Sequence, residues 1–248
     1  MKQSLFITVL ILVAITVSTL VYLYIFGAEG DAYGLRFIYM GGVLVPILMA
    51  LLIMVLTFIV ERLLSLKKAN GTGSITMFLK NMEKALMDGK VDGAIDICNK
   101  QRGSCANVIR TGLERYKQIA GDSKLGAEKQ MGEVQRAIEE AMMLETPLLE
   151  KNLIALSTIA SISTMLGLLG AVIGMIRSFG ALGQQGAVDA AQLSIGISEA
   201  LINTAIGLIV AISGIISYNY FVNKVDSFTY MIDEATYNVI QILTSRSK

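Results

Sequence analysis

One carboxylate stands in an otherwise apolar stretch of this sequence, GISEALINTAIGLIVA, which covers residues 196–211. The acid is Glu199, and the amide of Asn203 and the hydroxyl of Thr204 follow it within two helical turns. An ionised acid on a helix deep in lipid costs about 2.5–3.5 kcal/mol on insertion scales, so such residues usually face a cavity, a partner or an ion pathway. Among the three, the carboxylate alone can change charge near neutral pH. The set therefore indicates a cavity, a partner or a pathway beside this segment.

The composition is that of an integral membrane protein. Hydrophobic residues make up 54% of the chain and charged residues 17%, with a mean hydropathy of +0.61. Four apolar stretches reach the roughly 20 residues that a helix needs to cross a bilayer, at 4–26, 40–60, 153–176 and 193–221. None alternates with the period of two that a membrane strand requires. We therefore predict an all-α membrane protein with four transmembrane helices, two of which are long and extend into the cytoplasm.

Several function classes are disfavoured by the residues present. The formal net charge is +1, whereas a nucleic-acid-binding protein carries a dense basic face. There is no histidine to complete a zinc site or a catalytic dyad with Cys98 and Cys105, so we interpret both as reduced thiols, with redox sensing as the alternative. The sequence has no phosphate-binding loop and no nucleophile placed beside a base. We expect no enzymatic activity, no metal and no cofactor.

The distribution of Lys and Arg predicts the orientation in the membrane. Fifteen of the 21 lie between Glu61 and Lys151, and such basic segments resist translocation. A second basic region follows Phe221, with Lys224, Arg246 and Lys248. Both basic regions, and with them both termini, are therefore expected to be cytoplasmic. The first span could instead be a cleaved signal peptide. We favour a retained anchor, because the run is longer than a signal core and residues 26–28 make a poor cleavage site.

These segments divide the chain into five predicted regions. Turn signals such as Asn70-Gly71 and Arg102-Gly103 indicate short helical hairpins in the cytoplasmic part. From Ala127 the helical pattern continues into the third span, which predicts one continuous helix with a kink at Pro147. The regions are an N-terminal anchor with a short periplasmic loop (1–39), a transmembrane helix (40–60), a cytoplasmic helical domain (61–152), a transmembrane hairpin (153–222, with its periplasmic loop at about 180–192) and a cytoplasmic C-terminal helix (223–248).

Small residues recur at steps of three and four along both long spans. Little hydrophobic drive associates helices in lipid, so residues that permit close backbone approach matter more there. We predict that each long span turns a narrow face of small residues towards a closely approaching partner, with tight packing inside a bundle as the alternative. The predicted pore-lining positions are Gly167, Gly170, Gly174, Gly196, Ala200, Gly207 and Ala211.

The polar residues of the last span are predicted to share this narrow side. A rise of about 1.5 Å per residue places Glu199 about 9 Å and Thr204 about 17 Å below the external end of the helix. Glu199 is too shallow to carry a proton across the barrier alone, so a partner must supply a second acid. The alternative is a purely structural ion pair between Glu199 and Arg177, which ends the third span on the same side.

Three motifs together resemble the MotA/TolQ/ExbB proton-channel family, most closely its ExbB branch. They are LGLLGAVIGMIRSF (166–179), the stretch containing Glu199, and YNYF (218–221), and the order of segments matches over about 40–221. The extra N-terminal span is an addition to the family plan. The resemblance implies a homopentameric ring around the membrane helices of two ExbD- or TolR-like partner chains, whose aspartate carries the ion.

The resemblance also assigns roles to residues of this sequence. Thr204 matches a pore threonine of the family, and Glu199 matches its lumen-facing glutamate. Ala171 replaces a second pore threonine, and Thr164 or Ser163, about two turns away, could substitute for its hydroxyl. A hydroxyl oxygen is a potential ligand for a sodium ion. Its absence at Ala171 therefore favours protons over sodium as the conducted ion.

The function that the resemblance implies is an inner-membrane motor subunit. It would convert proton motive force into mechanical work for TonB-dependent outer-membrane import, with a TonB-like protein as a further partner. A TolQ-like subunit for envelope maintenance and a motility stator are alternatives of the same class. A non-conducting membrane scaffold is the alternative of a different class.

Overall fold

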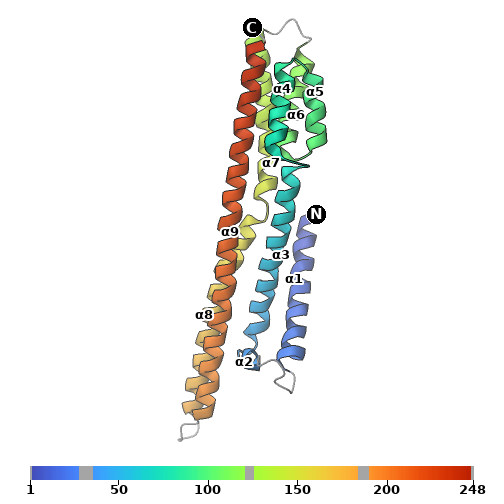
Figure 1. The fold of residues 1–248 in the computed structure, drawn as a ribbon. Helices are drawn as coiled ribbons and strands as arrows, with labels where there is room; N and C mark the ends of the chain where they lie inside the picture. The colour runs from blue at the N-terminus through green and yellow to red at the C-terminus, as the bar shows by residue number, and fades with distance from the viewer. Residues whose placement is uncertain (1, 28–35, 121–125, 184–189, 247–248) are drawn as a thin grey trace. The chain divides into compact units, whose positions relative to one another are not determined.

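The structure, a computed structural model, describes residues 2–27, 36–120, 126–183 and 190–246. All regular secondary structure within these ranges is helical (Figure 1). The predicted all-α class is therefore confirmed for the described residues. In chain order the helices are α1 (Lys2–Val21), the π-helix η1 (Tyr22–Phe26), α2 (Arg36–Tyr39), α3 (Leu44–Asn70), α4 (Ile75–Met87), α5 (Val91–Gln101), α6 (Ser104–Ile119), α7 (Ala127–Glu150), α8 (Leu153–Gly183) and α9 (Ala190–Arg246).

Four helical stretches are long and apolar enough to cross a membrane. They are Ile7–Phe26, Leu44–Met87, Glu128–Gly180 and Ala190–Arg246, of which the second and third each include a short break between two helices. The prediction of four candidate spans is confirmed by length and composition, since about 20 apolar helical residues match the thickness of the hydrocarbon.

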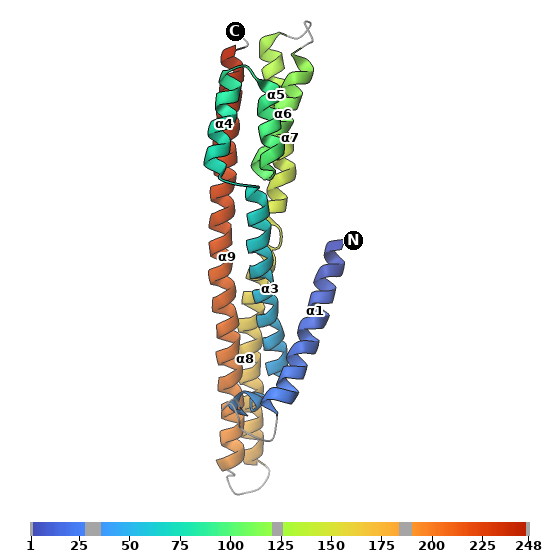
Figure 2. The same ribbon diagram turned by 45° about the vertical axis from the view of Figure 1, so that its right-hand side comes forward.

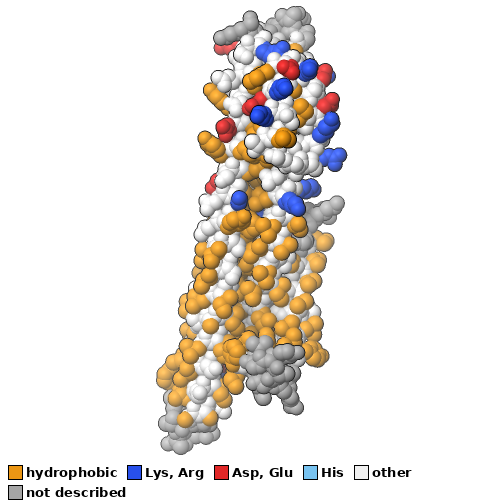
Figure 3. All heavy atoms as spheres, viewed as in Figure 1, with side chains coloured by type: hydrophobic (Ala, Val, Ile, Leu, Met, Phe, Trp, Pro, Cys, Tyr) orange, Lys and Arg blue, Asp and Glu red, His pale blue; other side chains and the backbone are white. Residues whose placement is uncertain are grey.

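The helices form two compact units, to which α3 and α9 each contribute a part. Unit 1 comprises Met1–Val60 and Asn152–Tyr220, and unit 2 comprises Glu61–Lys151 and Phe221–Lys248. On the face shown in Figure 3, apolar side chains cover unit 1, whereas Lys, Arg, Asp and Glu gather on unit 2. Each unit therefore has the surface expected for its own solvent, lipid for unit 1 and water for unit 2.

In unit 1, α8 and the first half of α9 lie side by side as a hairpin (Figures 1 and 2). Glycines bring their backbones into contact. A Cβ added at Gly174 would lie 2.7 Å from the carbonyl oxygen of Gly196, and one added at Gly207 would lie 2.7 Å from the carbonyl oxygen of Ser163. Real Cβ atoms do not approach oxygen this closely, so residues without a side chain are required at this helix separation.

In unit 2, α4 to α7 and the end of α9 bury amphipathic faces. Phe78, Met82 and Leu86 recur every four residues on α4 and are buried, as are Ile109 and Leu113 on α6. This spacing places the apolar side chains on one side of each helix. The end of α9 joins the unit through Arg246, whose Nη1 donates to the carbonyl oxygens of Leu86 and Met87 at 2.5 and 3.4 Å, at the end of α4.

Two loops of unit 2 meet backbone to backbone. Thr72 donates its N–H to the carbonyl of Gln101 at 2.7 Å, and the Gln101 amide donates to the carbonyl of Asn70 at 3.0 Å. Gly71 has φ +78°, and a Cβ there would overlap the carbonyl oxygen of Arg102. Only glycine combines this backbone conformation with so close an approach.

The predicted continuous helix from Ala127 into the third span is wrong. The helix α7 ends at Glu150 and α8 begins at Leu153, with Asn152 at φ +63° between them. Pro147 lies within α7, so the break comes after the proline instead of at it. Asparagine tolerates the left-handed conformation that redirects the chain at this point. Proline removes one hydrogen bond of the last turns of α7, which weakens that end of the helix.

The predicted periplasmic loop at about 180–192 is too long. Helix α8 continues to Gly183 and α9 starts at Ala190, while residues 184–189 lie outside the described part. In the structure Gly180 lies within α8, since small residues are tolerated in membrane helices.

Replacement of Gly71 by alanine should destabilise unit 2. The added Cβ overlaps a carbonyl and the backbone is left-handed, so we expect a loss of roughly 1–3 kcal/mol. Gly132→Ala is the matched control, because Gly132 lies exposed on α7 with nothing within 4 Å of an added Cβ. That change should be neutral or stabilise by up to about 1 kcal/mol. Thermal unfolding of the purified protein in detergent measures both, and equal unfolding midpoints would contradict the prediction.

Candidate functional site

The charged centre of unit 1 is an ion pair between α8 and α9. Arg177 Nη1 lies 2.6 Å from Glu199 Oε1. The Glu199 side chain is 9% exposed and the Arg177 side chain 58% exposed. The cation at this distance offsets part of the cost of burying a carboxylate. This is the contact that the sequence offered as the alternative to a pathway role for Glu199.

A two-glycine turn between α2 and α3 packs against this pair. Gly42 has φ +73°, and a Cβ added to it would lie 2.5 Å from Glu199 Oε1 and 3.7 Å from Arg177 Nη1. Asn203 Nδ2 donates to the carbonyl oxygen of Gly41 at 2.8 Å. Glu199 and Asn203 therefore meet adjacent residues of the same turn, and glycine at position 42 leaves room for the carboxylate.

The amide of Asn203 is buried but only half satisfied. The residue is 1% exposed, and its Oδ1 has no hydrogen-bond partner among the described residues. A buried acceptor without a donor costs about 1–3 kcal/mol. Gly170 on α8 makes room for this side chain, since a Cβ there would lie 2.5 Å from Asn203 Cβ.

Thr204 lies on a different side of α9 from Glu199. Five residues at about 100° each place the two side chains about 140° apart around the helix. Thr204 is half-buried, and its hydroxyl donates to the carbonyl of Ala200, one turn earlier, at 3.0 Å. Glu199 and Asn203 contact the α2–α3 turn, whereas no contact of Thr204 with that turn is seen among the described residues. A shared polar track of these three residues stays a prediction.

The predicted hydroxyl substitutes on α8 are engaged with their own helix. Ser163 is buried and Thr164 half-buried, and both donate to the carbonyl of Ala160, at 2.9 and 3.2 Å. Ala171 is half-buried. An intrahelical bond of this kind uses the hydroxyl proton and leaves an oxygen lone pair as an acceptor.

The predicted pore-lining small residues lie mainly in the contact between α8 and α9. Added Cβ atoms at the glycines would meet the opposite helix, as between Gly167 and Gly207 Cα at 3.2 Å. Packing inside the hairpin, the alternative given from sequence, therefore describes their place in this chain. All of these predicted residues are buried in unit 1: Gly167, Gly170, Gly174, Gly196, Ala200, Gly207 and Ala211.

Sequence reasoning missed Gly42 and Arg62. The pair Gly41-Gly42 before an apolar run is a turn signal, but nothing in the pattern shows that it meets Glu199.

Arg62 is buried, with 1% of its side chain exposed. It binds the Glu61 carboxylate through Nε and Nη2 at 2.8 and 2.7 Å, and its Nη1 donates to the Leu149 carbonyl at 3.1 Å. It thereby satisfies a carbonyl that the end of α7 leaves without an intrahelical partner.

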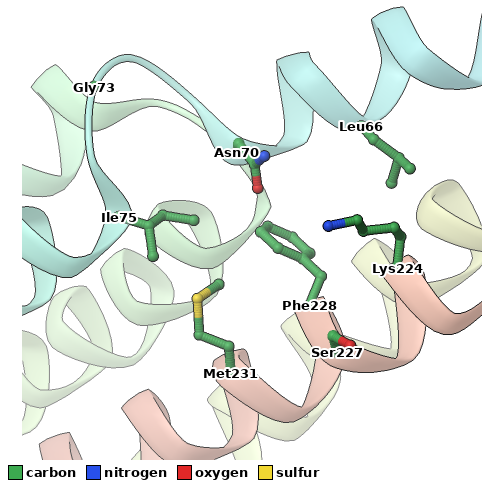
Figure 4. A pocket seen from close by; sticks show the side chains of 8 residues that line it. All are labelled: Leu66, Asn70, Gly73, Ile75, Lys224, Ser227, Phe228 and Met231. Atoms are coloured by element: carbon green, nitrogen blue, oxygen red, sulfur yellow. The ribbon is translucent and has the colours of Figure 1, made fainter.

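A pocket in unit 2 is lined by residues of α3, α4 and α9 and of the segment between α3 and α4. It encloses about 340 Å³, with Phe228, Met231 and the Lys224 side chain among its walls (Figure 4). The hydroxyl of Ser227 donates to the carbonyl of Asn223 at 2.7 Å, so this hydroxyl is not paired with a base. Across the described ranges, no group of three or more Cys, Asp or Glu side chains could hold a metal ion.

The family of the chain follows from comparison with known proteins. The sequence profile described as the MotA/TolQ/ExbB proton channel family matches residues 100–234, which include all of α6, α7 and α8 and most of α9. The chain belongs to this family. The resemblance drawn from the motifs is thus confirmed.

Named relatives match over part of their length. The chain is 42% identical over 91 residues to the biopolymer transport protein ExbB-like 3 of Synechocystis, covering 36% of this chain and 43% of that protein. It is 36% identical over 114 residues to the Tol-Pal system protein TolQ of Pseudomonas aeruginosa, covering 46% and 49%. It is 34% identical over 117 residues to the biopolymer transport protein ExbB of Aquifex aeolicus, covering 47% and 71%. The chain spans less than half of the first two relatives.

Replacement of Gly42 by alanine should displace the Glu199 carboxylate from its position beside Arg177. The Cβ would lie 2.5 Å from Glu199 Oε1 on a left-handed backbone, so we expect a loss of roughly 1–3 kcal/mol and a weakened ion pair. Gly180→Ala is the control, since nothing lies within 4 Å of an added Cβ there. Thermal unfolding in detergent distinguishes the two variants. A Gly42→Ala protein as stable as the control would show that the turn does not constrain Glu199.

The two cysteines should be unreactive in the folded protein. Burial raises the pKa of the Cys98 and Cys105 thiols to about 12, from an ordinary value of 9.0. Both thiols therefore stay protonated at pH 8, and the thiolate is the reactive form. Labelling with a maleimide at pH 8 should be slow in the native protein and fast after unfolding in denaturant. Native labelling at the rate of a free thiol would contradict this burial.

Proposed function

We propose that this chain is an ExbB-like motor subunit of the bacterial inner membrane that converts proton motive force into mechanical work. The observation that carries the proposal is the match to the proton channel family over residues 100–234. The similarity to proteins named for biopolymer transport supports it. The work would be passed through a partner chain to TonB-dependent import across the outer membrane.

The arrangement of titratable groups supports a partner that carries the proton. Glu199 is the one acid within Leu153–Gly183 and Ala190–Tyr220, and Arg177 holds its carboxylate. Thr204 lies about 140° from it around α9 and cannot itself change charge near neutral pH. A single-span chain of the ExbD or TolR kind, present as a dimer, would bring an acid opposite Thr204.

The exposed faces of the hairpin suit an assembly in lipid. Many exposed side chains of the hairpin are apolar, among them Leu168, Val172, Leu201 and Leu208. They could pack against lipid, neighbouring copies or a partner helix. We propose a homopentamer in which the Thr204 side of α9 faces the partner. Each proton moved down 100 mV would release about 2.3 kcal/mol, enough to bias a step of the partner helices.

The orientation and regions predicted from sequence are part of the same proposal. Both termini and residues 61–152 and 223–248 would be cytoplasmic, and residues 28–39 would be periplasmic. The first span would be retained as an anchor. The chain would act as a transport component without enzymatic activity or cofactor.

A TolQ-like role in envelope maintenance is the second candidate. It is favoured by the 36% identity to a Tol-Pal system protein over 114 residues. Expression in strains that lack ExbB or TolQ separates the two roles. Restored siderophore uptake supports the first, and restored detergent resistance supports the second.

Thr204→Val should abolish proton flux while leaving assembly intact. Valine matches the shape of threonine but removes the hydroxyl that would face the partner acid. Liposomes with a trapped pH-sensitive dye, containing the chain and its partner, measure the flux. Ser213→Ala is the control, because Ser213 lies on α9 with its hydroxyl bonded to the carbonyl of Ile209. Unchanged flux in assembled Thr204→Val protein would rule out this pathway, and no flux in wild-type protein would favour a scaffold.

A further inference from the structure

The unpaired oxygen of Asn203 is the least satisfied buried polar atom beside the ion pair. Its amide orientation is fixed, because Nδ2 donates to the Gly41 carbonyl at 2.8 Å and a flip would bring two oxygens together. Oδ1 is left as a buried acceptor without a donor among the described residues. A buried carbonyl oxygen of this kind is stabilised by any group that can present an O–H or N–H to it.

Glu199 is placed to become that donor. The two residues are four positions apart on α9, so their Cβ atoms lie about 5–6 Å apart on one side of the helix. Their side chains also meet adjacent residues of one turn, Glu199 at Gly42 and Asn203 at Gly41. An ionised carboxylate can only accept hydrogen bonds, whereas a protonated one has an O–H to donate.

We propose that Asn203 is the second hydrogen-bond partner of Glu199, which accepts from the carboxyl group once it is protonated. A hydronium ion on the external side transfers its proton to a Glu199 oxygen, forming the O–H bond and leaving water. The neutral carboxyl loses its electrostatic attraction to Arg177 and donates to Asn203 Oδ1. Loss of the proton returns the carboxylate to Arg177. The functional role of this exchange rests on the proposed proton conduction. The experiment that tests the exchange does not require conduction.

The groups around Glu199 are compatible with such an exchange. Arg177 comes from α8, and Tyr22 of η1 lies within electrostatic range of the carboxylate. The Tyr22 hydroxyl donates to the Tyr39 carbonyl at 3.0 Å, and the Tyr39 ring stacks on Tyr22. Helix α3 contributes no charged residue before Glu61. The carboxylate thus has a cation beside it in Arg177, and a protonated carboxyl group would have an acceptor in Asn203.

Infrared difference spectroscopy tests the role directly. The purified chain in lipid nanodiscs is titrated with acid, and the protonated-carboxyl C=O band of Glu199 is identified by its loss in Glu199→Gln. In the wild type this band should lie at the lower wavenumber of a hydrogen-bonded carboxyl. In Asn203→Ala it should move to higher wavenumber and require roughly tenfold more protons to appear, since its acceptor is gone.

Two further variants make the result specific. Arg177→Gln removes the cation, so the same band should persist to higher pH, opposite in direction to Asn203→Ala. Asn219→Ala, an exposed asparagine on the same helix, should change neither property. An unshifted band in Asn203→Ala would overturn the proposal. A wild-type band at the wavenumber of a carboxyl without a hydrogen bond would also overturn the proposal. That result is obtained with the wild-type protein and does not depend on the folding of a variant. Both infrared measurements use the purified chain without its partner and without proton flux. Failure of the proposed conduction would appear in the liposome assay and leave this test unaffected.

Discussion

Close backbone contact between α8 and α9 is the constraint on which unit 1 depends. Glycines on both helices let a carbonyl of one helix lie against the Cα of the other, as at Gly174 and Gly196. In lipid, dispersion contacts and weak polar contacts at short range replace the hydrophobic drive that packs helices in water. The closely packed hairpin therefore has two flanks, and the chemistry of each flank is set by which residues border the glycines.

The flanks differ in charge. One holds Arg177, Glu199 and Asn203 against the turn at Gly41 and Gly42, so a buried acid there has a fixed cation and a fixed amide. Thr204, away from that turn, offers a hydroxyl without a titratable neighbour on its own helix. The ion pair and the Thr204 hydroxyl are therefore about 140° apart around α9.

Arginine side chains serve backbone carbonyls in unit 2. Arg62 reaches the carbonyl of Leu149 at the end of α7, and Arg246 reaches that of Leu86 at the end of α4. Helix ends leave carbonyls unsatisfied, and a guanidinium can satisfy them while its charge complements the helix dipole. Gly71 adds a second contact within unit 2, in which the backbone of Gly71 packs directly against the backbone of Arg102.

The sequence by itself determined the helical class, the four membrane-length stretches and the family, because these follow from local hydropathy, spacing and motif. It also marked Glu199, Asn203 and the glycine stripes as unusual. Their partners were decided by the tertiary structure: Asn203 binds a carbonyl 162 residues away, and no periodicity within α9 indicates that contact. The break at Asn152 likewise depends on how the chain turns between two helices, which helical propensity does not encode. Periodicity shows which side of a helix is special, whereas packing decides what that side meets.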